Sequence, residues 1–186
     1  MFQQAGAEYF NPDEAAANIL SRNPGFSQQQ ANGEAWRQGK RLLERAITER
    51  RYFAFETTLG GNTIPNLLDD AITAGIEVRV WYVGLEGPEL HIVRVRSRAA
   101  KGGHDIPESK IRERYDRSRL NLIRLMPRLT ELLVYDNSTE ADPSTGAAPE
   151  LKLILHLVRG KVVDCCDLAA APEWTKPILA VGLRAS

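Results

Sequence analysis

Tyr52-Phe53-Ala54-Phe55-Glu56-Thr57-Thr58-Leu59-Gly60-Gly61 is the stretch on which the interpretation of the chain depends. Its first four residues are rich in aromatics and follow the charged Glu49-Arg50-Arg51, which predicts a short buried strand. Glu56, Thr57 and Thr58 come directly after that strand. Because ligands of open parallel sheets bind beyond the carboxyl ends of the strands, this carboxylate and these two hydroxyls are candidates for a binding site. From this stretch alone, an ordinary solvated strand end explains them equally well.

The flanking segments predict an α/β protein. A helix with a capping box at Ser27 and Gln30 precedes this strand, another helix runs from Asn62 to Gly75, and β-branched residues 76–85 predict the next strand. Alternating strands and helices are typical of a doubly wound parallel sheet. Further predicted elements are a strand at 132–138, a β-hairpin at 150–157 and 161–166, and a short helix or coil at 172–179.

Size and composition limit the alternatives. The 186 residues, 43% of them hydrophobic, suit one domain over 1–186, and the 24 basic and 24 acidic side chains give no global argument for nucleic acid or a membrane. No apolar run reaches the roughly 20 residues of a membrane helix, and residues 1–4 do not resemble a signal peptide, so we expect a cytoplasmic protein. The adjacent Cys165 and Cys166 suit neither a disulfide nor a metal site. We expect them to be packing residues, and we find no metal-ligand spacing.

A second carboxylate of interest is Asp13. The segment from Glu8 to Glu14 predicts a short strand that runs into a helix, with Pro12 in the first helical turn. The simplest explanation of Asp13 is a helix-start carboxylate that favours the positive end of the helix dipole. Alternatively, it lies at the same sheet edge as Glu56 and orients or deprotonates a hydroxyl.

Basic residues are concentrated between Arg94 and Arg128, where eleven Lys and Arg residues stand against four Asp and Glu residues. Helical spacing places two sets on shared faces: Arg94, Arg98 and Lys101, and Arg114, Arg117 and Asn121. Two such helices, joined by residues 102–107, would present guanidinium groups that suit phosphate oxygens. A solvated helical hairpin and a nucleic-acid surface remain alternatives. We expect His104, in the turn, to cap or hydrogen-bond rather than to catalyse.

Five motifs occur in a fixed order: Asn11-Pro12-Asp13-Glu14, Phe55-Glu56-Thr57-Thr58-Leu59, Gly102-Gly103-His104-Asp105-Ile106-Pro107, Ile111-Arg112-Glu113-Arg114-Tyr115 and Tyr135-Asp136-Asn137-Ser138. Through them, residues 8–138 resemble the zeta-toxin-like P-loop kinases. The resemblance implies a parallel sheet of P-loop kinase type with flanking helices and an arginine-rich helical lid, followed by a loop at 139–150 and a C-terminal β-hairpin and tail at 151–186. Zeta toxins use ATP and Mg²⁺ to phosphorylate UDP-N-acetylglucosamine on its sugar, and an antitoxin protein holds them inactive.

The resemblance also implies roles for single residues. Asp13 matches the catalytic carboxylate that takes the proton of the attacking hydroxyl, and Glu56 and Thr58, with Thr57 between them, match positions that contact the substrate. An arginine that the family carries after this threonine is replaced here by Leu59-Gly60-Gly61.

The arginines match the lid. Arg114 and Arg117 correspond to catalytic lid arginines that clamp the phosphates and steady the charge on the transferring phosphoryl group. Further candidates for phosphate binding are Arg94, Arg98 and Arg112.

The family also has an N-terminal strand followed by Gly-x-x-x-x-Gly-Lys-[Ser/Thr], which cradles the ATP phosphates and holds Mg²⁺. This sequence has no such motif. We therefore expect a chain that starts too late, lacks the middle strand of the sheet and is inactive alone. The alternative is a non-catalytic remnant that binds a phosphorylated ligand or an antitoxin through Asp13, Glu56 and the arginines. In the kinase interpretation, the acidic and hydroxyl groups face the arginine-bearing helices across one cleft.

Overall fold

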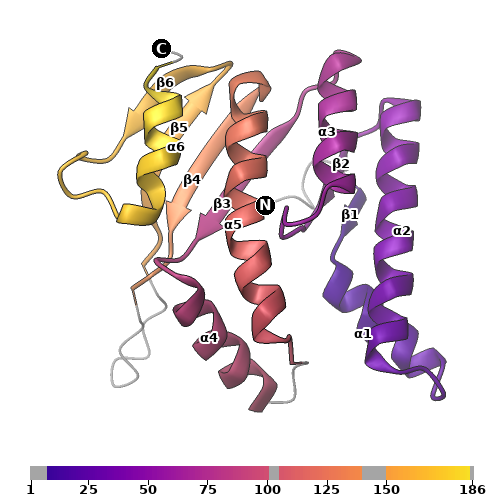
Figure 1. Ribbon diagram of the computed structural model, residues 1–186. Coiled ribbons are helices and arrows are strands. Elements are labelled where there is room, and N and C mark those ends of the chain that lie inside the picture. Colours follow the sequence, from indigo (N-terminus) through magenta and orange to yellow (C-terminus); the bar gives the residue numbers. More distant parts are fainter. Residues whose placement is uncertain (1–7, 101–104, 140–149, 185–186) are drawn as a thin grey trace. The chain divides into compact units, whose positions relative to one another are not determined.

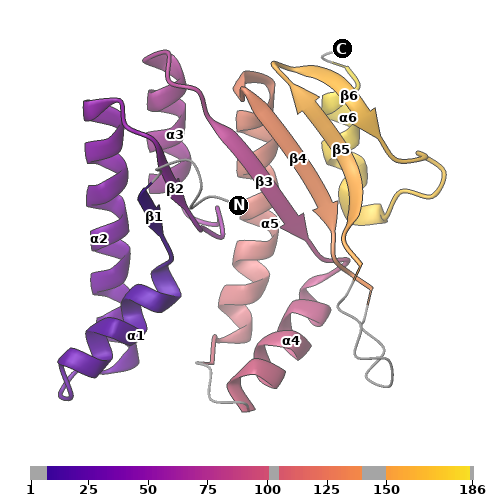
Figure 2. The same cartoon turned by 180° about the vertical axis from the view of Figure 1, so that it is seen from behind.

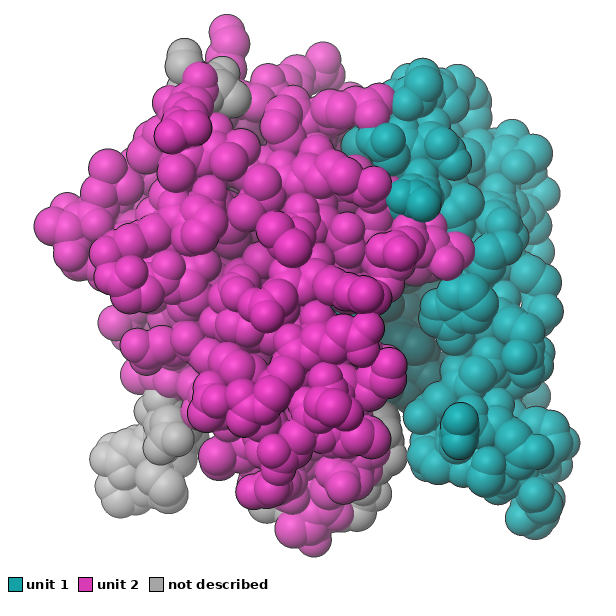
Figure 3. Space-filling model, in the orientation of Figure 1, with its two compact units in different colours: residues 1–58, 66–76 teal, residues 59–65, 77–186 magenta. Residues whose placement is uncertain are grey.

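The computed structural model describes residues 8–100, 105–139 and 150–184 (Figure 1). The chain divides into two compact units, which Figure 3 shows in different colours. Unit 1 comprises residues 1–58 and 66–76, and unit 2 comprises residues 59–65 and 77–186. A single domain over residues 1–186 stays a prediction.

Unit 1 combines a two-stranded parallel sheet with helices. Its elements are β1 (Glu8–Phe10), α1 (Pro12–Arg22), α2 (Gln28–Glu49), β2 (Phe53–Phe55) and most of α3 (Thr63–Thr73). β1 pairs with β2 in parallel, with Phe10 opposite Phe55. The contact between α1 and α2 has the small side chains of Ala16, Ala31 and Ala35 at its centre, with Ile19 and Leu20 packed against them.

Local signals set the helix boundaries of unit 1 much as the sequence predicts. The Asn11 side chain caps α1, and Ser27 and Gln30 form the predicted capping box of α2. α3 ends shortly before Gly75, which has a φ of +75°. The strand β2, however, is half-buried rather than buried, because it is an edge strand of a two-stranded sheet.

Unit 2 is built on a four-stranded mixed sheet. Its strands, in spatial order, are β3 (Arg79–Gly84), β4 (Glu131–Asp136), β5 (Lys152–Val158) and β6 (Lys161–Cys165). β3 and β4 are parallel, while β5 and β6 are antiparallel to their neighbours. Arg159 and Gly160, the two residues of the last turn, both have positive φ, as in a type I′ turn. The predicted C-terminal β-hairpin is therefore confirmed, and it extends the sheet beside β4.

Helices cover one face of this sheet. The helical elements of unit 2 are α4 (Pro88–Ala100), α5 (Glu108–Leu125), α6 (Lys176–Gly182) and the short 3-10 helices η2 (Met126–Arg128) and η3 (Glu173–Thr175). Figure 1 shows α5 and α6 in front of the sheet, and Figure 2 shows the opposite face of the sheet turned toward the viewer. Large buried side chains fill the covered face: Leu122, Leu125, Met126, Leu132, Val134, Leu155, Leu157 and Ile178.

The fold is mixed α/β, as predicted, but the described strands form two sheets instead of one parallel sheet. β1 pairs with β2, β3 pairs with β4, and no pairing between described residues joins β2 to β3. Helical crossovers account for the two parallel pairs, because a parallel connection needs a long crossover such as α1–α2 or α4–α5. The hairpin then makes the second sheet mixed.

Several sequence predictions concern single residues. Cys165 is exposed at the end of β6, so its predicted packing role is wrong, whereas Cys166 is half-buried; neither forms a disulfide. Lys101, Gly102-Gly103, His104 and most of the 139–150 loop lie outside the described residues. Among the helices that the structure describes, none combines the length and the apolar character needed to cross a membrane.

Candidate functional site

Unit 1 brings four predicted site residues to the carboxyl end of its parallel sheet. Phe10 and Phe55 are opposite each other where β1 and β2 end, and the Glu56 N–H donates to the Phe10 carbonyl at 3.1 Å. Asp13 follows in the first turn of α1. We call these four residues the acidic edge: Asp13, Glu56, Thr57 and Thr58. All four are exposed, so a ligand can reach them.

The Asp13 side chain is not the N-cap of α1. The Asn11 Oδ1 atom accepts hydrogen bonds from the backbone N–H groups of Asp13, at 2.9 Å, and Glu14, at 3.2 Å. The Asn11 side chain therefore caps α1. The Asp13 carboxylate still favours the helix dipole, but the described contacts leave it available for other chemistry.

Tyr9, which no sequence pattern singled out, contacts the acidic edge. The Tyr9 hydroxyl donates a hydrogen bond to Glu56 Oε1. The pKa of Tyr9 is raised chiefly because its proton is held by the Glu56 carboxylate, with a smaller effect of burial, while hydrogen bonding with Asn11 acts in the opposite direction. Strand pairing creates this contact, since Tyr9 lies opposite Ala54, two residues before Glu56. The sequence predicts the two short strands, but it does not show which residue of one strand lies opposite which residue of the other.

The candidate phosphate-binding arginines lie on α4 and α5, in unit 2. Arg112 Nη1 on α5 is 2.6 Å from Glu89 Oε1 on α4, so this ion pair connects the two helices. Arg117 Nη1 is 3.0 Å from Glu113 Oε1, one turn away on its own helix. Arg94 Nη2 donates to the Thr139 carbonyl at 3.2 Å. Exposed pairs of this kind contribute about 0–1 kcal/mol, so an anionic ligand could replace the carboxylates at small cost.

The loop from Leu59 to Gly61 is fixed on α5 within unit 2. The Asn121 amide donates to the Leu59 and Gly61 carbonyls at 2.8 Å and 2.9 Å. Gly60 lies against Arg114, where an added Cβ would come within 2.8 Å of the Arg114 Cγ atom. Leu59 is buried with a φ of +54°, a conformation that costs on the order of 1 kcal/mol for a residue with a side chain. The loop that replaces the expected arginine is therefore held by residues of the predicted lid face.

His91 adds a titrating group next to two of these arginines. Its ring makes an edge-on contact with Tyr115, with 5.7 Å between centroids. Burial lowers the pKa of His91, and the positive charges of Arg94 and Arg98 lower it further. The half-buried ring is therefore neutral near pH 7.

This arrangement predicts a stability change with pH. Because the folded pKa of His91 is lower than its unfolded value of about 6.5, the unfolded chain takes up a proton before the folded chain does, and stability is lost as the pH falls through that range. Urea denaturation at pH 7.5 and pH 5.5 measures the loss. His91→Phe keeps an aromatic ring beside Tyr115 and removes the titration, so its stability is expected to fall less than that of the wild type. All titrating groups other than His91 are present in both proteins. An equal loss of stability in the wild type and in His91→Phe would therefore contradict the prediction.

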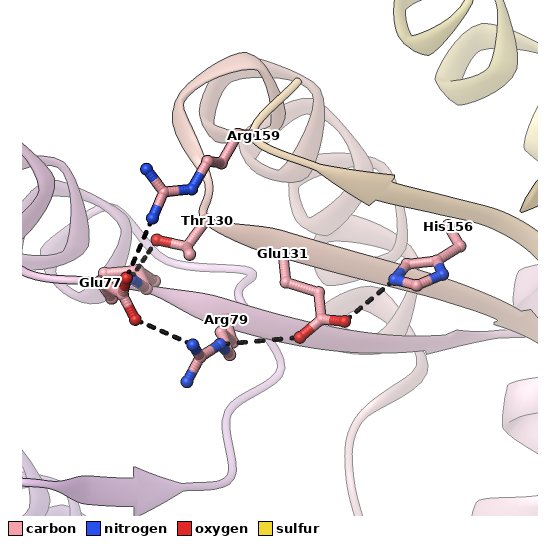
Figure 4. Close-up of polar contacts among 7 residues, drawn as sticks. Glu77, Arg79, Thr130, Glu131, His156 and Arg159 are labelled. Atoms are coloured by element: carbon pink, nitrogen blue, oxygen red, sulfur yellow. Dashed lines mark hydrogen bonds and ion pairs between the residues drawn. The ribbon is translucent and has the colours of Figure 1, made fainter. Parts of the chain in front are cut away.

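Figure 4 shows a separate polar network near the amino-terminal ends of β3 and β4. Arg79 contacts both Glu77, at 2.8 Å, and Glu131, at 3.6 Å, and Glu131 Oε1 is 2.9 Å from His156 Nε2. Arg159, at the hairpin tip, reaches Glu77 at 3.3 Å. His156 therefore has a partner, Glu131, on the neighbouring strand. Because the network lies away from the carboxyl ends of the strands, we assign it to structure rather than to the site.

The described residues do not fit a complete nucleotide site. Residues 8–100, 105–139 and 150–184 contain no group of three His, Cys, Asp or Glu side chains placed to hold a metal. Mg²⁺ in nucleotide enzymes is commonly held by one or two carboxylates together with substrate phosphates, a need that the acidic edge could meet in part. The sequence has no glycine-rich cradle for the triphosphate. The single cleft between acidic edge and arginines stays a prediction.

Comparison with known proteins finds a relative in Haemophilus influenzae (strain ATCC 51907 / DSM 11121 / KW20 / Rd), described as an uncharacterized protein. The two sequences are 31% identical over 113 residues, which cover 61% of this chain and 78% of the relative. The chain belongs to the family of this protein. No protein-family model matches the chain, and no solved structure matches it. The Haemophilus influenzae relative carries no description of activity to transfer.

Proposed function

We propose that the chain is the acceptor-binding part of a zeta-toxin-like small-molecule kinase, which transfers the γ-phosphate of ATP to a hydroxyl of a sugar nucleotide such as UDP-N-acetylglucosamine. The observation that carries this proposal is the acidic edge. Asp13 and Glu56 follow two paired, parallel strands at their carboxyl end, the position at which α/β proteins bind ligands. Both side chains are exposed there.

Each residue has a separate task in this proposal. Glu56 and Thr58 bind the acceptor through its hydroxyls, and Asp13 takes the proton as the hydroxyl oxygen attacks phosphorus. Arg114 and Arg117 stabilise the negative charge of the transferring group. The motifs that carry the resemblance support these assignments, and the protein would act in the cytoplasm, under the control of an antitoxin.

The strand pairing is compatible with a P-loop kinase sheet. The described residues pair β2 only with β1 and β3 only with β4, so each of these parallel pairs ends in an edge strand. In the kinases that the chain resembles, the strand that carries the phosphate loop lies in the middle of the sheet. Each pair thus leaves a strand edge to which a further strand could add.

A second candidate is a non-catalytic binding module for a phosphorylated ligand or an antitoxin. It is favoured by the lack of a Gly-x-x-x-x-Gly-Lys-[Ser/Thr] motif in these 186 residues. Such a module would use the acidic edge and the arginines but would not hydrolyse ATP. A nucleic-acid surface on the arginine helices is a weaker possibility, for which affinity would fall steeply with salt.

Calorimetry with UDP-N-acetylglucosamine tests the acceptor site directly. The wild type is expected to bind, and Glu56→Gln is expected to weaken binding by about 10- to 100-fold, since hydrogen bonds to a charged group are worth about 1.5–3 kcal/mol. Glu14→Gln, which removes an exposed carboxylate from the same helical turn as Asp13, is the matched control and should bind as the wild type does. No binding by the wild type, or equal binding by Glu56→Gln, would refute the sugar-nucleotide site.

A further inference from the structure

We propose that Tyr9 is a positioning residue that holds the Glu56 carboxylate in place for a hydroxyl-bearing ligand, an inference that rests on the proposed function. Its hydroxyl donates to Glu56 Oε1. Glu56 is otherwise an exposed side chain at the end of a strand, where it would exchange between rotamers. A fixed carboxylate is worth more to a ligand than a mobile one, because less side-chain freedom is lost on binding.

The backbone around Tyr9 is well suited to this task. Each residue of β1 is paired with a residue of β2, and Tyr9 lies at the centre of the three pairs, opposite Ala54. The side chain of a tyrosine turns about only two bonds, so an anchored backbone fixes its hydroxyl closely. Glu56 is fixed on the same ladder, since its N–H bonds to the Phe10 carbonyl.

Tyr9 also connects Glu56 to the helix that carries Asp13. Hydrogen bonding between Tyr9 and the Asn11 side chain is one of the influences on the Tyr9 hydroxyl. Asn11 in turn holds the first turn of α1 through the N–H groups of Asp13 and Glu14. Asn11 is therefore a neighbour of the Tyr9 hydroxyl as well as the cap of the turn that presents Asp13.

The contact also has a consequence for the ligand. Tyr9 takes one acceptor position of Glu56 Oε1 and leaves Oε2 and the second position of Oε1 for the ligand. A carboxylate oxygen accepts hydrogen bonds and donates none, which selects for donors such as sugar hydroxyls. The class of ligand that fits is therefore one that offers hydrogen-bond donors, such as the hydroxyls of a sugar.

The contact itself is tested by a tyrosine titration. NMR of protein labelled with ¹³C at the tyrosine ring follows the ionisation of each phenol, with Tyr9→Phe used to assign its signal. In the wild type, the pKa of Tyr9 is expected above the ordinary tyrosine value, and Glu56→Ala is expected to bring it down toward that value. An unchanged pKa of Tyr9 in Glu56→Ala would overturn the proposal whatever the ligand, and a merely structural tyrosine would show that result.

Ligand binding tests the consequence for function. Calorimetry with UDP-N-acetylglucosamine is expected to show about 3- to 10-fold weaker binding for Tyr9→Phe, the equivalent of one hydrogen bond, with an unchanged affinity for Tyr52→Phe. Tyr52 is a matched control because it is 81% exposed and lies outside the acidic edge. Wild-type affinity in Tyr9→Phe together with lost affinity in Glu56→Gln would overturn the role of Tyr9 while the proposed function stands. No binding by any variant or by the wild type would refute the proposed function itself, and with it the role of Tyr9 toward this ligand.

Discussion

Replacing Trp174 with alanine is expected to lower the free energy of unfolding of unit 2 by about 3–5 kcal/mol, the usual cost of deleting a buried tryptophan. Trp174 is 5% exposed, and its ring lies against the Gly84 backbone so closely that a Cβ there would be 2.3 Å from the ring. Its indole N–H donates to the buried carboxylate of Asp136 at 2.9 Å. The alanine variant therefore leaves both a cavity and a buried carboxylate that has lost one of its two donors, since Ser138 Oγ still donates to Asp136 Oδ1 at 2.5 Å.

Two further variants separate these causes. Trp174→Phe keeps most of the volume and loses chiefly the N–H donor, so about 1–3 kcal/mol is expected. Trp36→Ala removes an indole that is 48% exposed on α2, and a change below about 1 kcal/mol is expected. Urea denaturation measures the loss, and hydrogen exchange in β4 and α6 locates it in unit 2. A loss below 1 kcal/mol in Trp174→Ala would contradict the packing described here.

Trp174 also shows that contacts between residues far apart in the chain could not be predicted from the sequence. Residues 172–179 predicted no more than a short helix or coil, because the partners of Trp174 are far away in the chain, at Gly84 and Asp136. Locally encoded features were predicted well: the capping box at Ser27 and Gln30 and the β-hairpin are confirmed. Strand pairing was predicted less well, since periodicity identifies strands but does not say which of them become neighbours. The division into two sheets depends on that choice of neighbours.

The same distinction applies to the candidate site. Asp13 and Glu56 were predictable, because polar residues after two strands are expected at one sheet edge once those strands pair in parallel. Tyr9 was not, since its contact with Glu56 depends on the register of three paired residues. Asn121 was grouped with the arginines by helical spacing, but its partners, the Leu59 and Gly61 carbonyls, are backbone atoms that spacing cannot reveal.

Asp13→Asn is expected to lower the rate of phosphoryl transfer to the acceptor hydroxyl by about 100- to 10,000-fold, the range attributed to a lost general base. The substitution keeps the shape of the side chain and removes its ability to take a proton. The measurement is ADP formation with ATP, Mg²⁺ and UDP-N-acetylglucosamine, made on the product of the full open reading frame that contains these 186 residues. Glu14→Gln, one residue further along the same turn, should retain the wild-type rate.

Stability measurements make this test specific to chemistry. Because Asn11 caps α1, Asp13→Asn should leave the unfolding free energy nearly unchanged, whereas Asn11→Ala should cost about 1 kcal/mol. If Asp13→Asn lowers the rate but not the unfolding free energy, the lost function is proton transfer rather than stabilisation of α1. A wild-type rate in Asp13→Asn would refute the role of Asp13. If the full product binds the sugar nucleotide but forms no ADP, the kinase proposal fails and the binding module takes its place, because the acidic edge alone explains binding without turnover.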